Sequence, residues 1–330
     1  MRVPIVIAAC AASALFAGCG AATTGGGALP AAIASKGIVS WMNSAASSGD
    51  LLYVSDSDNE VTVYTYKSQQ LVGVLTGFTQ PMGGCADSRG NVYISDYAAQ
   101  TLVEYAHGKG KPVRSLSDAP DSPYGCAVDP TTGNLAVAND DGMHEGNIAI
   151  WTNASGEPVR YTDPTLGAFR SCAYDPHGNL LVTNGIQGYP YDSDFAWLPS
   201  GGTKLVDLSI PRSGTTSDWS GVYGVAWDGK DFAISDNAVY RVALLHGQAY
   251  YVGATPLQYP EEGRPDGPYT LYFPGGRGQA TQAFVGADVG ISGAVLMWEY
   301  PAGGQVSGEI THGIDYPYAI TISYQKDRGV

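Results

Sequence analysis

One short pattern returns along most of this chain. A unit opens with Pro-x-Gly-Cys-Ala-x-Asp or a variant of it, passes through Gly-Asn into a hydrophobic run that ends in Asp or Asn, and finishes on a second hydrophobic run. Successive units start 42 to 54 residues apart, at residues 82, 124, 169, 223, 269 and 318. Repeats of roughly 40–50 residues, built from short β-branched or aromatic runs between Gly, Asn, Asp and Pro turns, predict four-stranded propeller blades.

The sixth unit is divided between the two ends of the chain. Its first strand is C-terminal, at 317–322, and its remaining strands are N-terminal, at 51–56 and 61–64. A ring of sheets has to close, because an open ring leaves two sheet faces and two strand edges without partners. We therefore expect an all-β fold: a six-bladed β-propeller of four-stranded blades, closed by pairing of the N- and C-terminal strands in one blade.

The first 48 residues are expected to lie outside this array. Residues 1–18 have the form of a lipoprotein signal peptide, with a short apolar run after Arg2. The run ends in Leu-Phe-Ala-Gly-Cys, which resembles a bacterial lipobox and makes Cys19 the expected site of lipidation by acyl chains such as palmitate. An ordinary cleaved signal with an incidental cysteine is the alternative. Residues 19–48 would then be the lipidated Cys and a flexible tether, and 49–330 the propeller.

The expected location follows from this leader. Acyl chains on Cys19 place the protein in the bacterial cell envelope, lipid-anchored and extracytoplasmic, on the periplasmic side or at the cell surface. The formal net charge of −14 excludes nucleic acid as a partner, since phosphate requires a basic surface. An acidic body is also repelled by anionic lipid, so we expect membrane contact through the anchor only. The ligand of the body is then an unknown protein or small molecule.

The repeat resembles the NHL repeat, and it is similar to the SMP-30/gluconolactonase type of six-bladed propeller, over roughly residues 50–325. The resemblance implies the fold and leaves the activity open, because such propellers serve as binding platforms, sugar lactonases and lyases. In the lactonase-like members a Glu, an Asn and an Asp from different blades bind the metal. That Glu cannot be placed in this sequence, which counts against a lactonase.

Six polar residues occupy one repeat position, each at the end of a hydrophobic strand. They are Asp56, Asp96, Asn139, Asn184, Asp236 and Asp288. If these strand ends faced the central channel, the side chains would form an oxygen-rich ring suited to Ca²⁺ or Mg²⁺. The alternative is that each side chain caps the local turn. A residue repeated in every blade usually serves the blade, which favours the second interpretation.

Three cysteines, Cys85, Cys126 and Cys172, also align at one repeat position, where the fourth unit has Val225. Equivalent positions in neighbouring blades are expected to lie beyond disulfide reach. We therefore predict three free, buried thiols that pack as small hydrophobic side chains.

The sequence contains no recognisable catalytic motif, and the candidates for a functional site are correspondingly few. His144, in a lengthened hairpin loop, is the best candidate for an acid or base beside a metal. Two insertions break the repeat, and they are either recognition surfaces or neutral surface excursions. The candidate binding residues in them are Tyr189, Tyr191, Asp192, Tyr259, Glu261 and Glu262. A non-catalytic binding or interaction module is the favoured function, and a metal-dependent lactonase or lyase acting at the central channel is the alternative.

Overall fold

The computed structural model describes residues 39–140, 146–163, 167–184, 195–208, 210, 224–236, 238–259, 270–273, 283–288 and 293–325. All of them belong to one compact unit, Val39–Val330. Strands make up nearly all of the regular structure; the helices among these residues are two short 3-10 turns, η1 (Ser44–Ser47) and η2 (Thr152–Ala154). No helix in this part of the chain is long and apolar enough to cross a membrane.

The described strands form six sheets of four or five strands, which we number in chain order. Sheet 1 contains β1 (Trp41–Met42), β4 (Leu71–Leu75), β3 (Val61–Thr65), β2 (Leu51–Asp56) and β26 (Pro317–Ser323). Sheet 2 contains β5 (Pro81–Ala86), β6 (Val92–Asp96), β7 (Thr101–Tyr105) and β8 (Pro112–Ser117). Sheet 3 contains β9 (Pro123–Val128), β10 (Leu135–Asn139), β11 (Asn147–Trp151) and β12 (Val159–Tyr161).

The other three sheets follow the same order. Sheet 4 contains β13 (Phe169–Tyr174), β14 (Leu180–Asn184), β15 (Phe195–Leu198) and β16 (Val206–Asp207). Sheet 5 contains β17 (Val225–Trp227), β18 (Phe232–Ser235), β19 (Ala238–Leu245), β20 (Gln248–Gln258) and β24 (Gly304–Gln305). Sheet 6 contains β21 (Thr270–Tyr272), β22 (Ala283–Asp288), β23 (Ala294–Glu299) and β25 (Gly308–Ile310).

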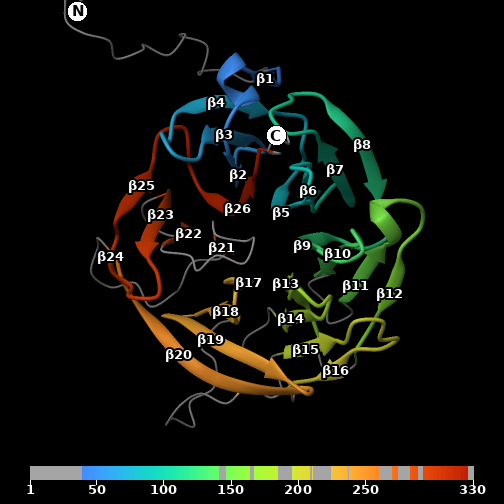
Figure 1. Ribbon diagram of the computed structural model, residues 1–330. Coiled ribbons are helices and arrows are strands. Elements are labelled where there is room, and N and C mark those ends of the chain that lie inside the picture. Colours follow the sequence, from blue (N-terminus) through green and yellow to red (C-terminus); the bar gives the residue numbers. More distant parts are fainter. Residues whose placement is uncertain are drawn as a thin grey trace, which may run out of the picture. The chain divides into compact units, whose positions relative to one another are not determined.

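The first strand of each sheet is the innermost one. Figure 1 shows β26, β5, β9, β13, β17 and β21 around one centre, with the later strands of each sheet farther out. These first strands contact one another in turn, from β26 to β5, β9, β13, β17 and β21, and β21 again contacts β26. The sheets therefore radiate from a middle that is lined by their first strands.

Sheet 1 is assembled from both ends of the described chain. β2 and β26 pair antiparallel, with Leu51 opposite Ser323 and Val54 opposite Ile320. The predicted pairing of the C-terminal strand with the N-terminal strands is thereby confirmed. The strand count of this sheet differs from the prediction, because β1 adds a fifth strand.

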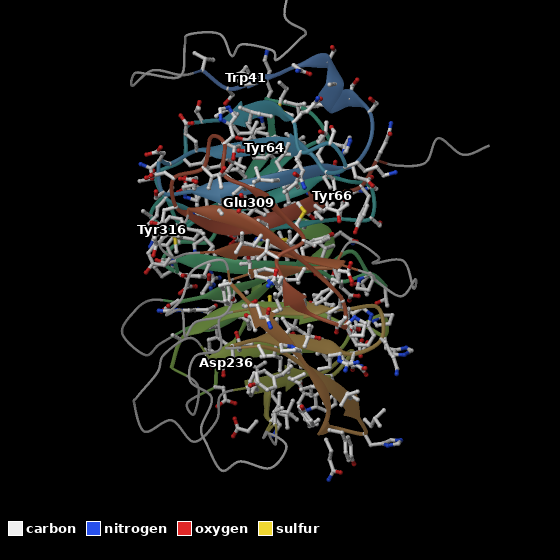
Figure 2. All side chains as sticks on the ribbon, turned by 90° about the vertical axis from the view of Figure 1, so that its left-hand side faces the viewer. Trp41, Tyr64, Tyr66, Asp236, Glu309 and Tyr316 are labelled. Carbon is white, nitrogen blue, oxygen red and sulfur yellow. A yellow bond between two sulfur atoms is a disulfide. The ribbon has the colours of Figure 1, made fainter. Side chains whose placement is uncertain are left out.

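The body begins earlier than the sequence analysis placed it. β1 pairs with the edge strand β4, with Trp41 opposite Val74, and Figure 2 shows Trp41 at one end of the body. Next to this pair, the Thr76 amide donates a hydrogen bond to the Ser40 hydroxyl at 2.9 Å. The tether expected to reach residue 48 is therefore corrected: residues 39–48 cover the edge of sheet 1, whose backbone groups would otherwise lack partners.

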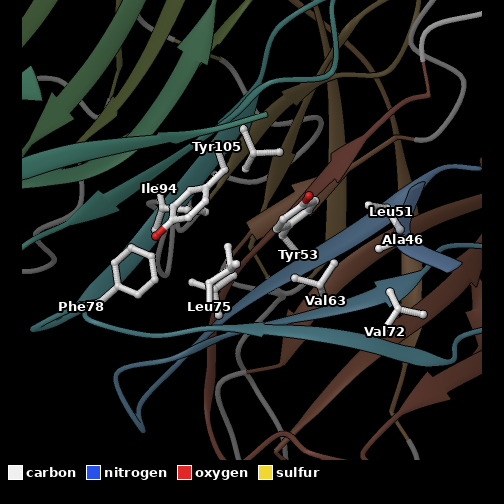
Figure 3. Packing of buried hydrophobic residues seen from close by; sticks show 11 residues of the cluster. Ala46, Leu51, Tyr53, Val63, Val72, Leu75, Phe78, Ile94 and Tyr105 are labelled. Atoms are coloured by element: carbon white, nitrogen blue, oxygen red, sulfur yellow. The ribbon is translucent and has the colours of Figure 1, made fainter. Parts of the chain in front are cut away.

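The hydrophobic core lies between the sheets. Each of the six buried clusters of the described residues joins two neighbouring sheets, in order from sheets 1 and 2 to sheets 6 and 1. Figure 3 shows the cluster between sheets 1 and 2, which includes Tyr53, Leu75, Ile94 and Tyr105. A sheet covered on both faces needs apolar side chains at successive positions, which explains why its strands are continuous hydrophobic runs.

The Asp and Gly-Asn of the repeat form the turn between the first two strands of a sheet. In sheet 2, Oδ1 of Asp87 accepts hydrogen bonds from the amides of Arg89 and Asn91, at 2.8 and 2.9 Å. Gly90 in the same turn has a φ of +86°, which favours glycine. Asp175 makes the equivalent bonds in sheet 4, so this part of the repeat is explained by turn chemistry.

The predicted state of two cysteines is wrong. Cys85 and Cys126 form a disulfide between sheets 2 and 3, with a Cα–Cα distance of 5.5 Å. Two physical reasons explain the error. First strands approach closely: a Cβ added to Gly83 would lie 1.9 Å from the carbonyl oxygen of Tyr124. The two cysteines are also offset by one residue, since Cys85 pairs with Tyr93 of β6, whereas Cys126 pairs with Val137, the equivalent of Ile94.

Cys172 behaves as predicted. It is a free cysteine, it is buried, and it packs in the cluster between sheets 3 and 4. Burial raises the pKa of the Cys172 thiol to about 12, so the thiol remains protonated at neutral pH.

Candidate functional site

A cavity of about 820 Å³ occupies the middle of the body. The first strands of all six sheets and the turns that follow them form its wall. Each sheet contributes at least one large side chain, and these include Met82, Tyr124, Arg170, Trp227, Tyr272 and Tyr318. A cavity of this size falls in the range of small-molecule sites, which are concave and mostly apolar with a few polar groups.

Four of these residues stand at β-bulges, each next to the first residue of an inner strand. In sheet 2, Pro81 and Gly83 pair with the adjacent residues Asp96 and Ser95, so Met82 is the extra residue between them. The same irregularity occurs at Tyr124, Arg170 and Tyr318, in sheets 3, 4 and 1. Bulges reorient a side chain and are common beside binding sites. We call these four residues, Met82, Tyr124, Arg170 and Tyr318, the cavity mouth.

Arg170 is the charged member of the cavity mouth, and it is held on two sides. Its Nε donates a hydrogen bond to Oδ2 of Asp140 at 2.9 Å, and the Asp140 side chain is buried. The centre of its guanidinium lies 5.5 Å from the ring centroid of Tyr124, within cation–π range. Tyr97 in turn meets the Tyr124 ring edge-on at 6.2 Å. The mouth thus presents a flat, ordered arrangement whose positive charge is already balanced.

The carboxylates of the cavity wall accept hydrogen bonds within the turns that follow the inner strands. Asp87 and Asp175 accept the turn hydrogen bonds described above, and Asp129 accepts from the amide and hydroxyl of Thr131 and from the hydroxyl of Thr132. Burial opposes ionisation of Asp129, but these hydrogen bonds outweigh it and lower its pKa. Asp129 is therefore ionised at neutral pH and is already satisfied by its own turn.

The phenols of the wall keep their protons at neutral pH. Burial raises the pKa of Tyr272 to about 12 and raises the pKa of Tyr174 further. Burial thus keeps the thiol of Cys172 and the phenols of Tyr174 and Tyr272 in their neutral forms at neutral pH.

Comparison with known proteins rests on structure alone. No family model matches the chain, and no curated protein matches it. A solved structure described as the nidogen/laminin complex is similar to it with a TM-score of 0.60 and 14% identity, covering 84% of this chain and 99% of that one. A protein of unknown function from Bacteroides caccae is similar with a TM-score of 0.59 and 13% identity, covering 84% and 99%. The chain is a β-propeller. At these identities the likeness shows the fold of the propeller and nothing of its activity.

The propeller places two of the predicted ring residues away from the cavity. Asp96 is buried, and its carboxylate accepts hydrogen bonds from the amides of Thr79 and Gln80, at 2.9 and 2.7 Å, just before β5. Asp56 accepts from the amides of Asp315 and Tyr316, at 3.0 and 3.2 Å, just before β26. Each carboxylate thus fixes the connection that leads into the first strand of its own sheet.

Of the other four residues of the predicted ring, two have side chains in the described part of the structure and two do not. Asn139 is buried and donates from Nδ2 to Oδ1 of Asn147 at 3.0 Å. Asp236 is also buried, and its backbone amide donates to the carbonyl of Ala238 at 3.0 Å. Neither residue lines the cavity among the described residues. Asn184 and Asp288 end β14 and β22, and their side chains lie outside the described part.

Most of the loop and leader candidates cannot be located. Cys19, His144, Tyr189, Tyr191, Asp192, Glu261 and Glu262 lie outside the described residues. Tyr259 is described: it follows β20, and its ring meets Trp298 edge-on at 5.5 Å. Half-buried in the packing between sheets 5 and 6, Tyr259 supports the propeller more than it offers a free recognition surface.

One group of acidic side chains among the described residues could hold a cation. The carboxylates of Asp56, Asp58 and Asp315 offer oxygens that lie within 4.8 Å of one another. Asp58 and Asp315 are exposed. Burial raises the pKa of Asp58, and Asp315 and Asp56 add to the shift by repulsion.

The sequence analysis missed the residues of the cavity mouth. Position 124 entered only as the start of a repeat unit, and Arg170 was not singled out. The available signal was positional: both residues directly follow the first residue of an inner strand, the place where Met82 and Tyr318 also stand.

Proposed function

We propose that this propeller is a binding module of the cell envelope, and that it takes a neutral small molecule with a flat ring at the cavity mouth. The observation that carries the proposal is that Tyr124, Arg170 and Tyr318 stand at β-bulges and line a cavity of about 820 Å³, with the Arg170 guanidinium over the Tyr124 ring. Flat aromatic and guanidinium faces favour stacking of a ring.

The neutrality of the ligand is argued from the charges of the wall. Arg170 is balanced by Asp140, Arg89 by Asp87, and Asp129 by the hydrogen bonds of its turn. An ionic ligand would have to leave water without gaining an unpaired opposite charge, which is unfavourable. A neutral ring with polar edges avoids that cost.

We further propose that the propeller is a closed ring of six blades, related to the NHL and SMP-30-like propellers. The contacts of the first strands support this, since they run from β26 through every other sheet and back to β26. The shared hydrophobic clusters follow the same circuit and include one between sheets 6 and 1.

The proposed location is extracytoplasmic, on a lipid anchor at Cys19. The disulfide between Cys85 and Cys126 supports an oxidising compartment, because disulfides persist outside the cytosol and are rare within it. The leader sequence supports the anchor, as argued from its lipobox-like ending.

A metal-dependent lactonase or lyase is the less favoured function. Among the described residues, the carboxylates of Asp56 and Asp96 accept hydrogen bonds from backbone amides. Both are therefore poorly placed to hold a metal ion in the channel. The acidic group of Asp56, Asp58 and Asp315 is the place where Ca²⁺ or Mg²⁺ would be looked for.

The test is a thermal-shift screen of the full chain in mild detergent with a library of neutral and charged ring compounds. We expect the compounds that raise the melting temperature to be neutral, and their effect to fall at least tenfold in apparent affinity in Tyr124→Ala and Arg170→Ala. Tyr250→Ala, an exposed ring on the outer strand β20, is the matched control and should bind normally. Binding that survives both mouth variants would contradict the proposed site, and Ca²⁺-dependent turnover of a lactone would favour the enzyme.

A further inference from the structure

An exposed tyrosine lies directly beside the cavity mouth. The Tyr316 ring meets the ring of Tyr318, a residue of the mouth, edge-on at a centroid distance of 5.7 Å. Tyr318 is half-buried and lines the cavity, whereas Tyr316 is 38% exposed and is not among the described residues that line it. The aromatic surface of the mouth therefore continues out of the cavity to the outer margin of the body, where Figure 2 shows Tyr316.

The backbone of Tyr316 is fixed by the turn between β2 and β3. The buried carboxylate of Asp56 accepts hydrogen bonds from the amides of Asp315 and Tyr316, at 3.0 and 3.2 Å. The Ser57 amide in turn donates a hydrogen bond to the carbonyl of Tyr316 at 3.1 Å. A tyrosine on a fixed backbone offers a large, flat contact area and loses little conformational entropy on binding, which makes it an effective contact residue.

Tyr316 differs from the other aromatic residues near the mouth or on the surface. Tyr97, which meets Tyr124 edge-on, is half-buried, so it supports the mouth from within the body. Trp41 and Tyr250, the other exposed aromatic residues of the described part, stand on the outer strands β1 and β20. Tyr316 is thus the residue of the described part that combines an exposed ring with contact to the mouth.

Negative charge lies beside this ring. Asp58 and Asp315, the residue before Tyr316, are exposed, and their carboxylate oxygens lie within 4.8 Å of each other. Exposed carboxylates repel anions and accept hydrogen bonds from hydroxyl groups. At the mouth itself, the charge of Arg170 is balanced by Asp140. A neutral ring with hydroxyl groups at its edge therefore fits this surface, and an anionic ring does not.

Resting on the function proposed above, we propose that the ligand is a linear neutral oligosaccharide that extends from the cavity mouth over an outer subsite made of Tyr316, Asp58 and Asp315. Its terminal ring binds at the mouth, the next ring stacks on Tyr316, and its hydroxyl groups donate hydrogen bonds to the two carboxylates. A sugar ring supplies both parts of this fit, because its C–H face is apolar and its edge carries hydroxyl groups. The second ring binds at a high effective concentration once the first is bound, so a chain binds more tightly than a single ring.

The test is calorimetric titration of the full chain, in a detergent without a sugar headgroup, with 1,4-linked oligomers of N-acetylglucosamine and of glucose. We expect the affinity to rise about tenfold from one unit to three in at least one series. Tyr316→Ala should abolish this rise and leave the affinity for the single unit unchanged, and Tyr316→Phe, which keeps the ring, should retain the rise. Tyr250→Ala, whose ring is 46% exposed on β20, is the matched control and should bind as the wild type does.

The outcomes separate this inference from the function on which it rests. If neutral ring compounds bind at the mouth but neither sugar series binds, or if the rise with length is absent or survives in Tyr316→Ala, the outer subsite is overturned and the mouth remains. If no ring compound binds, both proposals fail. Glucosamine oligomers have the same linkage and carry positive charge. Tighter binding of these than of the N-acetylglucosamine oligomers would overturn the neutral ligand in favour of a cationic one at Asp58 and Asp315.

Discussion

A single residue of strand register distinguishes Cys85 from Cys126. Alternate residues of a strand point to opposite faces, so this offset turns the Cys85 side chain toward sheet 3 and the Cys126 side chain toward sheet 2. Cys172 stands at the Cys126 position and meets no cysteine, because it faces sheet 3 as Cys126 faces sheet 2. Alignment of the repeats by eye hides an offset of this size.

The disulfide is expected to stabilise the body strongly. It closes a loop across a sequence separation of 41, for which chain entropy gives a contribution of about 3–4 kcal/mol. The double variant Cys85→Ala/Cys126→Ala should therefore unfold at clearly lower denaturant in equilibrium measurements. Cys172→Ala is the control: reductant should lower its stability by the same amount as it lowers that of the wild type. A wild type whose stability is unchanged by reductant would contradict the disulfide between Cys85 and Cys126.

Gly83 is expected to tolerate no side chain. A Cβ there would lie 1.9 Å from the carbonyl oxygen of Tyr124, a backbone atom that cannot move aside cheaply. Gly83→Ala should lower the free energy of unfolding by about 2 kcal/mol or more. Gly110→Ala is the matched control, since its nearest neighbour is the flexible side chain of Met42 at 3.3 Å. Equal stability of the two variants in urea titration would refute the close approach of the first strands.

At the scale of elements, the inner two or three strands of each sheet were predictable and the edges were not. Strands such as β2 and β6 are buried at every residue, and their sequences are hydrophobic runs closed by Ser-Asp that stand out between turns. β1 and β24 have two residues each and carry no periodic signal. The bulges at Tyr124 and Arg170 were not predicted for a related reason. One extra residue changes the direction of a side chain and leaves the hydrophobic pattern of the strand intact.

Removal of β26 is expected to unfold the propeller. This strand pairs with β2 along its length and contacts β5 and β21, so its loss exposes the core between sheets 6 and 1 and removes a neighbour of β5. A chain ending at Tyr316 should show no cooperative thermal transition by circular dichroism. A chain ending at Gln325 keeps every described strand and should melt as the wild type does. Cooperative melting of the shorter chain would show that sheet 1 closes without its C-terminal strand.

At the scale of the whole molecule, the fold was accessible from the sequence and the candidate site was not. The repeat predicted a propeller because several units share the turn between their first two strands, as at Asp87 and Asp175. The cavity mouth is made of residues that differ from unit to unit, such as Met82, Tyr124 and Arg170, and no repeat pattern predicts their grouping. The polar residues that do repeat, such as Asp96, hold the connections of the scaffold.

The predicted lipid anchor at Cys19 can be tested by the distribution of the protein between membrane and soluble fractions. Cys19→Ala should move the protein from the membrane fraction to the soluble fraction and abolish incorporation of labelled palmitate. Cys10→Ala, within the apolar run of the leader, is the matched control and should stay membrane-bound. Labelled palmitate in the Cys19→Ala protein would place the modification elsewhere.

The antiparallel pairing of β2 with β26 also determines how the body responds to mechanical force. Leu51 starts β2 and Ser323 ends β26, and these two residues face each other, so the chain enters and leaves at the same end of the pair. Tension between a tethered N-terminal side and a pulled C-terminal side therefore acts on one backbone hydrogen bond at a time, as in opening a zipper. A protein held to a membrane in this way would first lose the short pairing of β1 with β4 and would then yield along that seam, while the remaining sheets are still folded.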